Sequence, residues 1–316
     1  MKSENTGLVT LGEVMGALTA REAGTLAHNR EFRLGIAGAE ATVAVGVSRL
    51  GEPASWIGRL GNDEIGDLVA REFRAENVTM IARREAVATG LMLVTRRLEG
   101  LASVTYYRRG SAGSLLSPQD VDAGVISGCG VLHVTGITPA LGPGPADAVH
   151  VAIEVARSAG VPVSFDVNYR SSLWSADLAR PVFREMAQRA DLVFVTMAEA
   201  QLLVAEDDPA RAALAISALG PRRVIVKLGP AGAVAATDGV IATQEIFPVP
   251  VVNSVGAGDG FVAGYLASFL KRQSAAESLR TAAAAAAFAV AASGDWEGLP
   301  TPGELHLLQV DDGVMR

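Results

Sequence analysis

The sequence VPVSFD at residues 161–166, followed by LVFVT at 192–196 and VIVKL at 224–228, decides the fold class. Each run is almost continuously apolar and rich in β-branched residues, as expected for strands that are covered on both faces. Apolar residues at helical spacing fill the intervening stretch 178–189. A succession of strand, helix and strand predicts a parallel, doubly wound sheet with right-handed crossovers.

The same alternation extends toward the N-terminus. Further strands are expected at 7–11, 55–57 and 131–135, and further helices at 40–50, 65–76 and 146–159. Ser117-Pro118 and Asp208-Pro209 each place a capping side chain before a proline, which predicts two more helix starts. The 316 residues are therefore expected to form one α/β domain spanning 1–316, with a mostly parallel central sheet flanked by helices.

Two segments do not fit this alternation. Residues 19–36 and 86–107 lack long helical periodicity, and the second contains GLMLVT at 90–95 and ASVTYY at 102–107. A turn at Glu99-Gly100 between these runs predicts a β-hairpin. We expect a small β-sheet, formed from about 13–36 and 86–112, that stands off the core and covers a site as a lid. Its free edge also predicts a homo-oligomer.

Charge and cysteine content narrow the class of protein. The net charge of −7 argues against a nucleic-acid partner. Cys129 is the single cysteine, which excludes an internal disulfide and suits a reducing compartment. Glu13 interrupts the apolar stretch 8–18, and the apolar run 282–292 is about half a membrane span. We expect a cytoplasmic protein with no membrane partner.

The sequence VGAGDG at 255–260 precedes an apolar helix expected at 261–270. Two glycines allow a tight turn, and the first amides of the helix have no acceptor within it. Because the helix dipole is positive there, this loop is suited to hold a transferring phosphate. Asp259 is then placed to accept the proton of an attacking hydroxyl. The chain has neither a G-x-x-x-x-G-K-[ST] phosphate loop nor a complete G-x-G-x-x-G.

Five ordered motifs resemble the ribokinase-like (PfkB) carbohydrate kinases over nearly the full chain. They are GIAGAEATVAVGVSRLG at 35–51, IGRLGNDEIG at 57–66, FDVNYRSSLW at 165–174, VKLGPAG at 226–232 and VGAGD at 255–259. Three further stretches look like 2-keto-3-deoxygluconate kinases within that family: YYRRGSA at 106–112, DVNYR at 166–170 and GDWEGLP at 294–300. The resemblance implies a ribokinase-like fold with a β-sheet lid, ATP and Mg²⁺ as cofactors, and a sugar or sugar acid as acceptor.

The resemblance also implies a role for each matching position. Acceptor contacts would come from Gly38, Tyr106, Arg108, Arg170 and Asp259, with Asp259 as the base. The anion hole would be formed by Gly256, Ala257 and Gly258, and the nucleotide would lie by Lys227, Gly229, Gly232, Gly256 and Gly258. Glu199 would order the Mg²⁺ shell through water.

The carboxylate of a keto-deoxy sugar acid could be bound by two of these residues, Arg108 and Arg170. Arginine holds a carboxylate through parallel charge-assisted bonds, and Arg108 and Arg170 come from different elements. Strand alternation places Tyr106 and Arg108 on one face and Tyr107 on the other. An anionic acceptor is therefore our leading hypothesis.

Departures from the family pattern keep alternatives open. Thr42 and Thr196 stand where the family commonly has asparagine, and Met92 stands where keto-deoxygluconate kinases often have a substrate-binding tyrosine. Asn253-Ser254 replaces the usual Asp-Thr, which argues against activation by a monovalent cation. A kinase for a neutral sugar, such as fructose or ribose, or for a nucleoside is the first alternative. A catalytically inactive sugar- or nucleotide-binding protein is the second.

Overall fold

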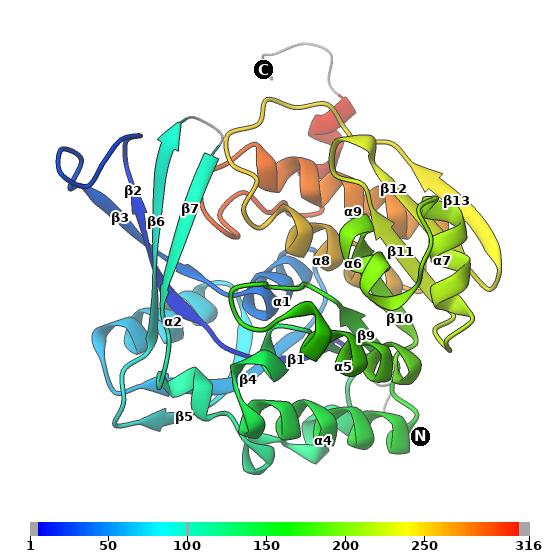
Figure 1. The fold of residues 1–316 in the computed structure, drawn as a ribbon, viewed down its shortest axis with the longest axis horizontal. Helices are drawn as coiled ribbons and strands as arrows, with labels where there is room; N and C mark the ends of the chain where they lie inside the picture. Colours follow the sequence, from blue (N-terminus) through cyan, green and yellow to red (C-terminus); the bar gives the residue numbers. More distant parts are fainter. Residues whose placement is uncertain (1–5, 99–100, 310–316) are drawn as a thin grey trace.

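A computed structural model describes residues 6–98 and 101–309, and within them two separate sheets are formed (Figure 1). The larger sheet has nine strands in the described part of the chain. Its strands lie in the order β13 (Val240–Gln244), β12 (Ala233–Thr237), β11 (Arg223–Lys227), β10 (Leu192–Thr196), β9 (Val163–Asp166), β8 (Val131–Thr135), β1 (Leu8–Leu11), β4 (Ala54–Gly61) and β5 (Val78–Glu85). Neighbouring strands pair in parallel from β11 to β5, and β12 alone runs in the opposite direction, antiparallel to both β11 and β13. The predicted mostly parallel sheet is confirmed.

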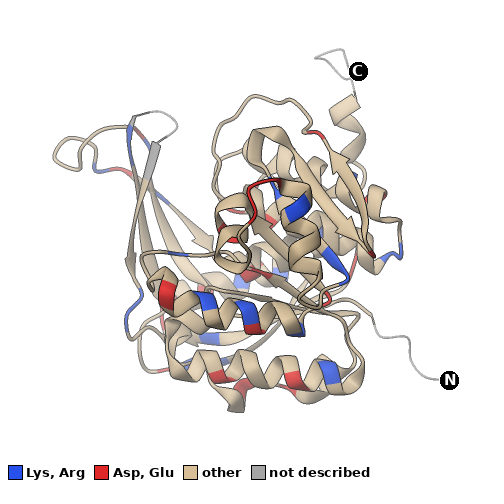
Figure 2. Ribbon diagram, turned by 45° about the vertical axis from the view of Figure 1, so that its right-hand side comes forward, with Lys and Arg blue, Asp and Glu red and all other residues tan. Residues whose placement is uncertain are grey.

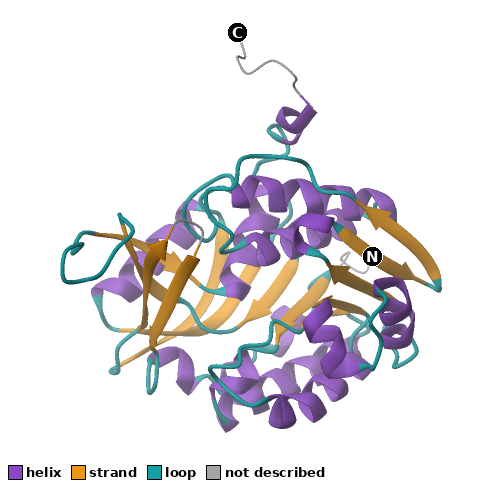
Figure 3. Cartoon of the chain, turned by 45° about the horizontal axis from the view of Figure 1, so that its top comes forward, coloured by secondary structure: helices purple, strands orange, loops and turns teal. Residues whose placement is uncertain are grey.

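Helices cover both faces of this sheet (Figure 3). One face packs against α1 (Ala39–Arg49), α2 (Glu64–Ala75), α8 (Ala257–Leu270) and α9 (Ala275–Val290). The other packs against α3 (Ala123–Ser127), α4 (Pro143–Ala159), α5 (Ala176–Arg189), α6 (Met197–Leu203) and α7 (Pro209–Ser217). Strand β10 shows the reason, because Phe194 enters the first core while Val193 and Val195 enter the second.

The outer surfaces of the helices carry charge of both signs. Figure 2 shows acidic and basic residues interspersed along α4 and α5. No helix in the described residues is long and apolar enough to cross a bilayer.

The smaller sheet, called here the small sheet, lies to one side of the core (Figure 1). Its order is β3 (Phe32–Ala37), β2 (Met15–Ala20), β6 (Gly90–Leu98) and β7 (Leu101–Tyr107). β6 and β7 are antiparallel, as the hairpin prediction requires, and the predicted turn at Glu99-Gly100 lies outside the described residues. One face of the small sheet is an apolar cluster of Met15, Ala17, Ala37, Met92 and Val94 with Val104 and Tyr106 packed against it.

Some elements differ from the prediction. Ser117-Pro118 begins only the short 3₁₀ helix Pro118–Asp120, because the Asp120 carboxylate turns back to the Ser117 N–H and hydroxyl. Asp208 does cap an α-helix, and its side chain accepts from the Arg211 N–H at 2.8 Å. Strand β5 was not predicted, since its sequence VTMIARRE mixes apolar and charged residues.

Candidate active site

Three neighbouring parallel strands bring polar residues to one edge of the large sheet. β9 ends at Asp166, β10 at Thr196 and β11 at Lys227, and β10 lies between the other two. The Lys227 ammonium donates to both Asp166 oxygens at 2.8 Å, across the end of β10. Ligands of open α/β sheets bind outside the carboxyl ends of the strands. This edge of the sheet is therefore the candidate ligand-binding site.

Lys227 stays charged in this setting. Burial works to lower the pKa of Lys227, but the neighbouring carboxylates of Asp166 and Glu199 outweigh burial and raise it. The only heavy atom near a methyl group added at Gly258 would be the Lys227 Nζ, at 3.8 Å. Lys227 thus supplies positive charge beside the glycine loop that precedes α8.

Glu199 lies in the first turn of α6, directly after β10. Its carboxylate accepts from the N–H groups of Thr196 and Tyr169, each at 2.8 Å, and from the Thr196 hydroxyl at 3.0 Å. The Thr196 hydroxyl in turn accepts from the Glu199 N–H, which completes a capping box. The side chain predicted to order Mg²⁺ therefore belongs to the same strand-end cluster and is held rigidly.

The glycine loop at 256–258 starts α8. Gly256 is its N-cap in the left-handed region, with φ of 78°, and a side chain there would lie 2.2 Å from the Asp295 carbonyl oxygen. Only glycine fits that turn and that close approach. The Gly260 amide donates to the Gly256 carbonyl at 2.7 Å, whereas the amides of Gly258 and Asp259 have no acceptor within the described residues. These free amides at a helix N-terminus suit an anion.

Asp259 is half-buried in the first turn of α8. Its Oδ1 accepts from the Asn168 side-chain amide at 3.2 Å. Burial raises the pKa of Asp259 above the ordinary value, while Arg170, Lys227 and the Asn168 amide act in the opposite direction. A carboxylate with a raised pKa, flanked by cations, is suited to take a proton from an acceptor hydroxyl.

Asn168 holds an unusual backbone conformation beside that base. It is 6% exposed and has φ of 41°, in the left-handed region. Asparagine tolerates this region better than most residues, and such conformations concentrate at functional sites. Asn168 lies within DVNYR, and the sequence predicted no role for it. The structure brings its side-chain amide to Asp259.

Asp295 is a second carboxylate of the site that sequence analysis left without a role. It accepts from the Gly38 amide at 3.3 Å, at the N-terminus of α1. Burial, followed by the charge of Asp259, raises the pKa of Asp295 to about 7. Asp295 also lines a cavity of about 300 Å³, together with Met92 and Val255. Asp295 therefore lies between Gly38 and a partly open cavity under the small sheet.

Tyr106 and Arg108 lie together on the small sheet, as strand alternation predicts. The Arg108 guanidinium lies over the Tyr106 ring at 5.3 Å, while Tyr107 is 61% exposed. Arg108 also has a partner that sequence analysis missed. Its Nη2 lies 2.5 Å from Oε2 of the buried Glu13, whose Oε1 accepts from the Ser111 hydroxyl. The charge of Arg108 is thus already balanced by a carboxylate.

The remaining predicted positions lie in the turn after β11. Gly229 and Gly232, with φ of 57° and 87°, bound the short 3₁₀ helix Gly229–Ala231 that follows Lys227. A side chain at Gly232 would lie 2.1 Å from the Gln244 carbonyl oxygen. The structure thus groups Asp259, Arg170, Lys227 and Glu199, and the 229–232 turn directly follows Lys227. Tyr106 and Arg108 lie together on the small sheet, where Arg108 pairs with Glu13.

Comparisons with known proteins find similar kinases over nearly the whole chain. The chain is 38% identical over 299 residues to the 2-dehydro-3-deoxygluconokinase of Bacillus subtilis strain 168, which covers 93% of this chain and 92% of that protein. It is 32% identical over 314 residues to the probable fructokinase-2 of Arabidopsis thaliana, with 94% of each covered. A solved structure of a putative ribokinase II from E. coli with ATP and Mg²⁺ is similar at a TM-score of 0.89 and 27% identity, with 96% of this chain and 99% of that chain covered.

The fold and the strand-end site define a ribokinase-like kinase. The profile of the pfkB family carbohydrate kinases matches residues 5–302. The chain belongs to this family, and it is an enzyme of the carbohydrate kinase class.

Proposed function

We propose that the enzyme transfers the γ-phosphoryl group of ATP to a hydroxyl of a sugar acid, with 2-keto-3-deoxygluconate as the first acceptor to test. The observation that carries the proposal is Asp259, which lies beside the free amides of the α8 N-terminus with its pKa raised by burial. The relative from B. subtilis named 2-dehydro-3-deoxygluconokinase supports this acceptor.

In the proposed reaction, Asp259 accepts the proton of the acceptor hydroxyl. The acceptor oxygen forms a bond to the γ-phosphorus, and the bond from that phosphorus to the β,γ-bridging oxygen breaks as ADP leaves. The amides of Gly258 and Asp259, at the positive end of α8, stabilise the charge on the transferring group. Ala257 and Gly256 shape this anion hole.

The nucleotide is proposed to lie between this anion hole and the turn at Gly229 and Gly232, with the Lys227 ammonium beside its phosphates. When bound, Mg²⁺ neutralises phosphate charge and orients the phosphates for transfer. In the described residues no group of three or more acidic, histidine or cysteine side chains forms a metal cage. The fit is therefore that of an ion held mainly by phosphates and water, with Glu199 as the candidate partner for a bound water.

The acceptor is proposed to occupy the space under the small sheet near Gly38, Tyr106, Arg108 and Arg170. Covering this space excludes water, which would otherwise compete for the phosphoryl group. Arg170 remains within electrostatic reach of Asp259 and Asp295. It is the arginine better placed to offset charge at the base.

A neutral-sugar acceptor is the second candidate, and two observations favour it. Glu13 balances the charge of Arg108, and Met92 presents a thioether rather than a hydroxyl to the cavity. Steady-state rates for a panel of sugar acids, fructose, ribose and nucleosides with Mg·ATP decide between the candidates. Turnover of neutral acceptors alone would overturn the sugar-acid proposal.

Asp259→Asn tests the base. It keeps the shape of the side chain and removes its basicity, so we expect kcat to fall about 10²–10⁴-fold. Acceptor and ATP affinity, measured by calorimetry, should change little. Asp63→Asn, at the N-cap of α2, is the matched control and should leave kcat unchanged. A kcat for Asp259→Asn equal to that of the wild type would refute the assignment.

A further inference from the structure

The residues from 293 to 299, called here the 293–299 turn, touch both sides of the proposed site. The Asp295 carboxylate accepts from the Gly38 amide at 3.3 Å and lines the cavity under the small sheet. The Asp295 carbonyl packs against the α-carbon of Gly256, where even a methyl group would overlap it. A displacement of this turn would therefore move an acceptor-side carboxylate and press on the anion loop together.

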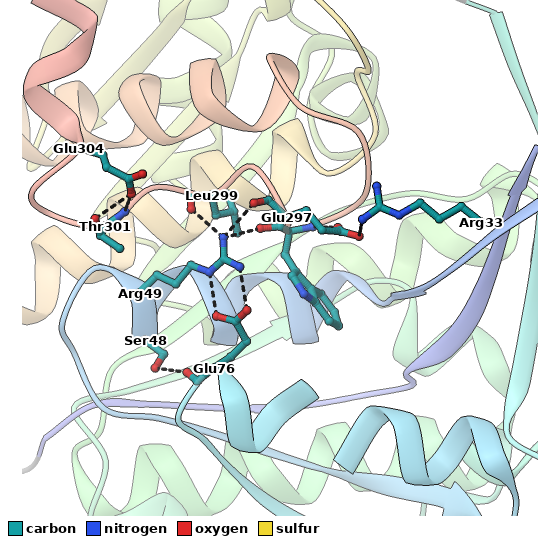
Figure 4. Close-up of polar contacts among 9 residues, drawn as sticks. Arg33, Ser48, Arg49, Glu76, Glu297, Leu299, Thr301 and Glu304 are labelled. Carbon is teal, nitrogen blue, oxygen red and sulfur yellow. Dashed lines mark hydrogen bonds and ion pairs between the residues drawn. The ribbon is translucent and has the colours of Figure 1, made fainter. Parts of the chain in front are cut away.

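Arg49, in the last turn of α1, holds this turn from behind (Figure 4). Its Nη1 donates to three main-chain carbonyls: Trp296 at 2.9 Å, Glu297 at 3.2 Å and Leu299 at 2.8 Å. Its Nε and Nη2 donate to the two Glu76 oxygens at 2.8 and 2.7 Å. The Glu76 carboxylate thus fixes the guanidinium through two bonds, and the remaining amino group, Nη1, donates to the turn.

Helix α1 therefore contacts the same turn at both of its ends. The helix has 11 residues and, at about 1.5 Å per residue, is about 16 Å long. At its N-terminus the Gly38 amide donates to the Asp295 carboxylate, and in its last turn Arg49 donates to main-chain carbonyls from Trp296 to Leu299. Trp296, 4% exposed, packs against Phe73 with ring centroids 6.3 Å apart, which anchors the middle of the turn in the core.

The small sheet reaches this turn as well. Arg33 of β3 pairs with Glu297 at 3.4 Å (Figure 4). It also donates to the Ser293 hydroxyl at 3.1 Å. Arg33 is 55% exposed, so this pair is weak, whereas the Arg49–Glu76 pair is largely buried. Arg49 is thus the stronger of the two holds on the turn.

We infer that Arg49 is a positioning residue for the kinase reaction: through the 293–299 turn it fixes Asp295 at the acceptor cavity and Gly256 at the anion loop. The inference rests on the proposed function only in taking the acceptor to bind beside Asp295. Arg49 is not itself a lining residue of the cavity, and its bonds are to Glu76 and to main-chain carbonyls of the turn, including that of the lining residue Glu297, so its effect passes through the turn.

Arg49→Met and Arg49→Lys test the inference. Since a displacement of about 1 Å in a site costs up to about 10²-fold, we expect kcat/KM for the acceptor to fall 10- to 100-fold in Arg49→Met. Arg49→Lys keeps the charge and some carbonyl bonds, so it should recover part of this loss. The KM for ATP should rise by less than the acceptor kcat/KM falls, because the 293–299 turn reaches the nucleotide side through Gly256, whereas Lys227 is held by Asp166 and Gly232 lies against Gln244.

Arg59→Met is the matched control. Arg59 is also a buried arginine that bonds two acids, Glu85 and Asp120, but its bonds do not include the turn. It should lower the melting temperature as Arg49→Met does and leave acceptor kcat/KM within about twofold. An unchanged acceptor kcat/KM in folded Arg49→Met, or equal losses for acceptor and ATP, would overturn the inference. These rates are measured with the acceptor that the wild-type enzyme turns over best in the panel. An error in the sugar-acid proposal would therefore appear in the panel and would not affect the test of Arg49.

Discussion

The proposed base Asp259 accepts a hydrogen bond from the Asn168 side-chain amide at 3.2 Å. This bond stabilises the carboxylate and so lowers its pKa, against burial. Asn168→Gly removes the amide while keeping a residue that tolerates φ of 41°. The pKa of Asp259 should then rise further. Because the base acts deprotonated, the acidic limb of the kcat/KM–pH profile should move to higher pH.

Asn77→Gly is the control for this experiment, since Asn77 also has positive φ, 55°, but lies at the end of α2. Its profile should match that of the wild type. An acidic limb in Asn168→Gly at the wild-type position or below it would contradict the proposed role of Asn168.

The contacts of Asn253 predict whether a monovalent cation activates the enzyme. Its Oδ1 accepts from the Val255 N–H at 3.1 Å, and its amide nitrogen lies 3.5 Å from the Gly294 carbonyl oxygen. A neutral amide that donates toward a carbonyl supplies no negative charge for K⁺. We expect turnover in potassium and tetramethylammonium chloride at equal ionic strength to agree within about twofold. Activation by potassium alone would contradict this prediction.

Candidate site residues could be proposed from the sequence where the local pattern alone indicates the structure around them. The sequence indicated Asp259 and the glycines around it, because a helix start with free amides can be inferred from local pattern. Glu13 and Asp295 could not be assigned in the same way. Their partners, Arg108 and Gly38, lie far away in the sequence, and only the tertiary structure brings these groups together.

At the scale of elements, the start of α6 explains a departure from the family pattern. Thr196 stands where asparagine is usual, and its hydroxyl completes the capping box with Glu199. Thr196→Ala should cost about 1 kcal/mol of unfolding free energy in urea titrations. Thr196→Asn restores a side chain of similar capping strength and should stay within about 0.5 kcal/mol of the wild type. Equal losses in both variants would contradict a capping role.

The predicted elements follow the strength of the apolar pattern. Strands β8 and β10 have the predicted bounds, because both are buried on two faces and read as unbroken apolar runs. Strand β4 extends to Gly61, past the predicted end at 57, since Gly58 and Arg59 interrupt its pattern. The edge pair β12 and β13 was missed, because an alanine-rich strand carries little β signal.

At the scale of the whole molecule, the outer face of the small sheet predicts self-association. Leu18 pairs with Leu34 and with Leu93 in register, on the face opposite the apolar cluster of the cavity. Leu34 is 44% exposed. Leu18 and Leu93 are partly exposed, and with Leu34 they form an apolar strip across three neighbouring strands, which favours contact with a second copy. We propose a homodimer through this face.

The double variant Leu34→Lys/Leu93→Lys should therefore be monomeric at micromolar concentration in light scattering, where the wild type is dimeric. Leu178→Lys on α5 changes an equally apolar side chain, 66% exposed, on another surface and should remain dimeric. A wild type that scatters as a monomer would refute the dimer.

The central pair of the small sheet has a consequence for how the protein is made. Met15 of β2 faces Gly90 of β6 in a parallel pair, and the crossover between these strands contains α1, β4, α2 and β5 of the core. A ribosome-bound chain cannot form this pair until β6 has emerged, and long-range pairing of this kind is slow. In nascent chains that stop before Gly90, β2 and β3 can pair only with each other, and the edge of β2 that later pairs with β6 stays open. A chaperone that binds open strand edges would therefore meet the edge of β2 before β6 has emerged.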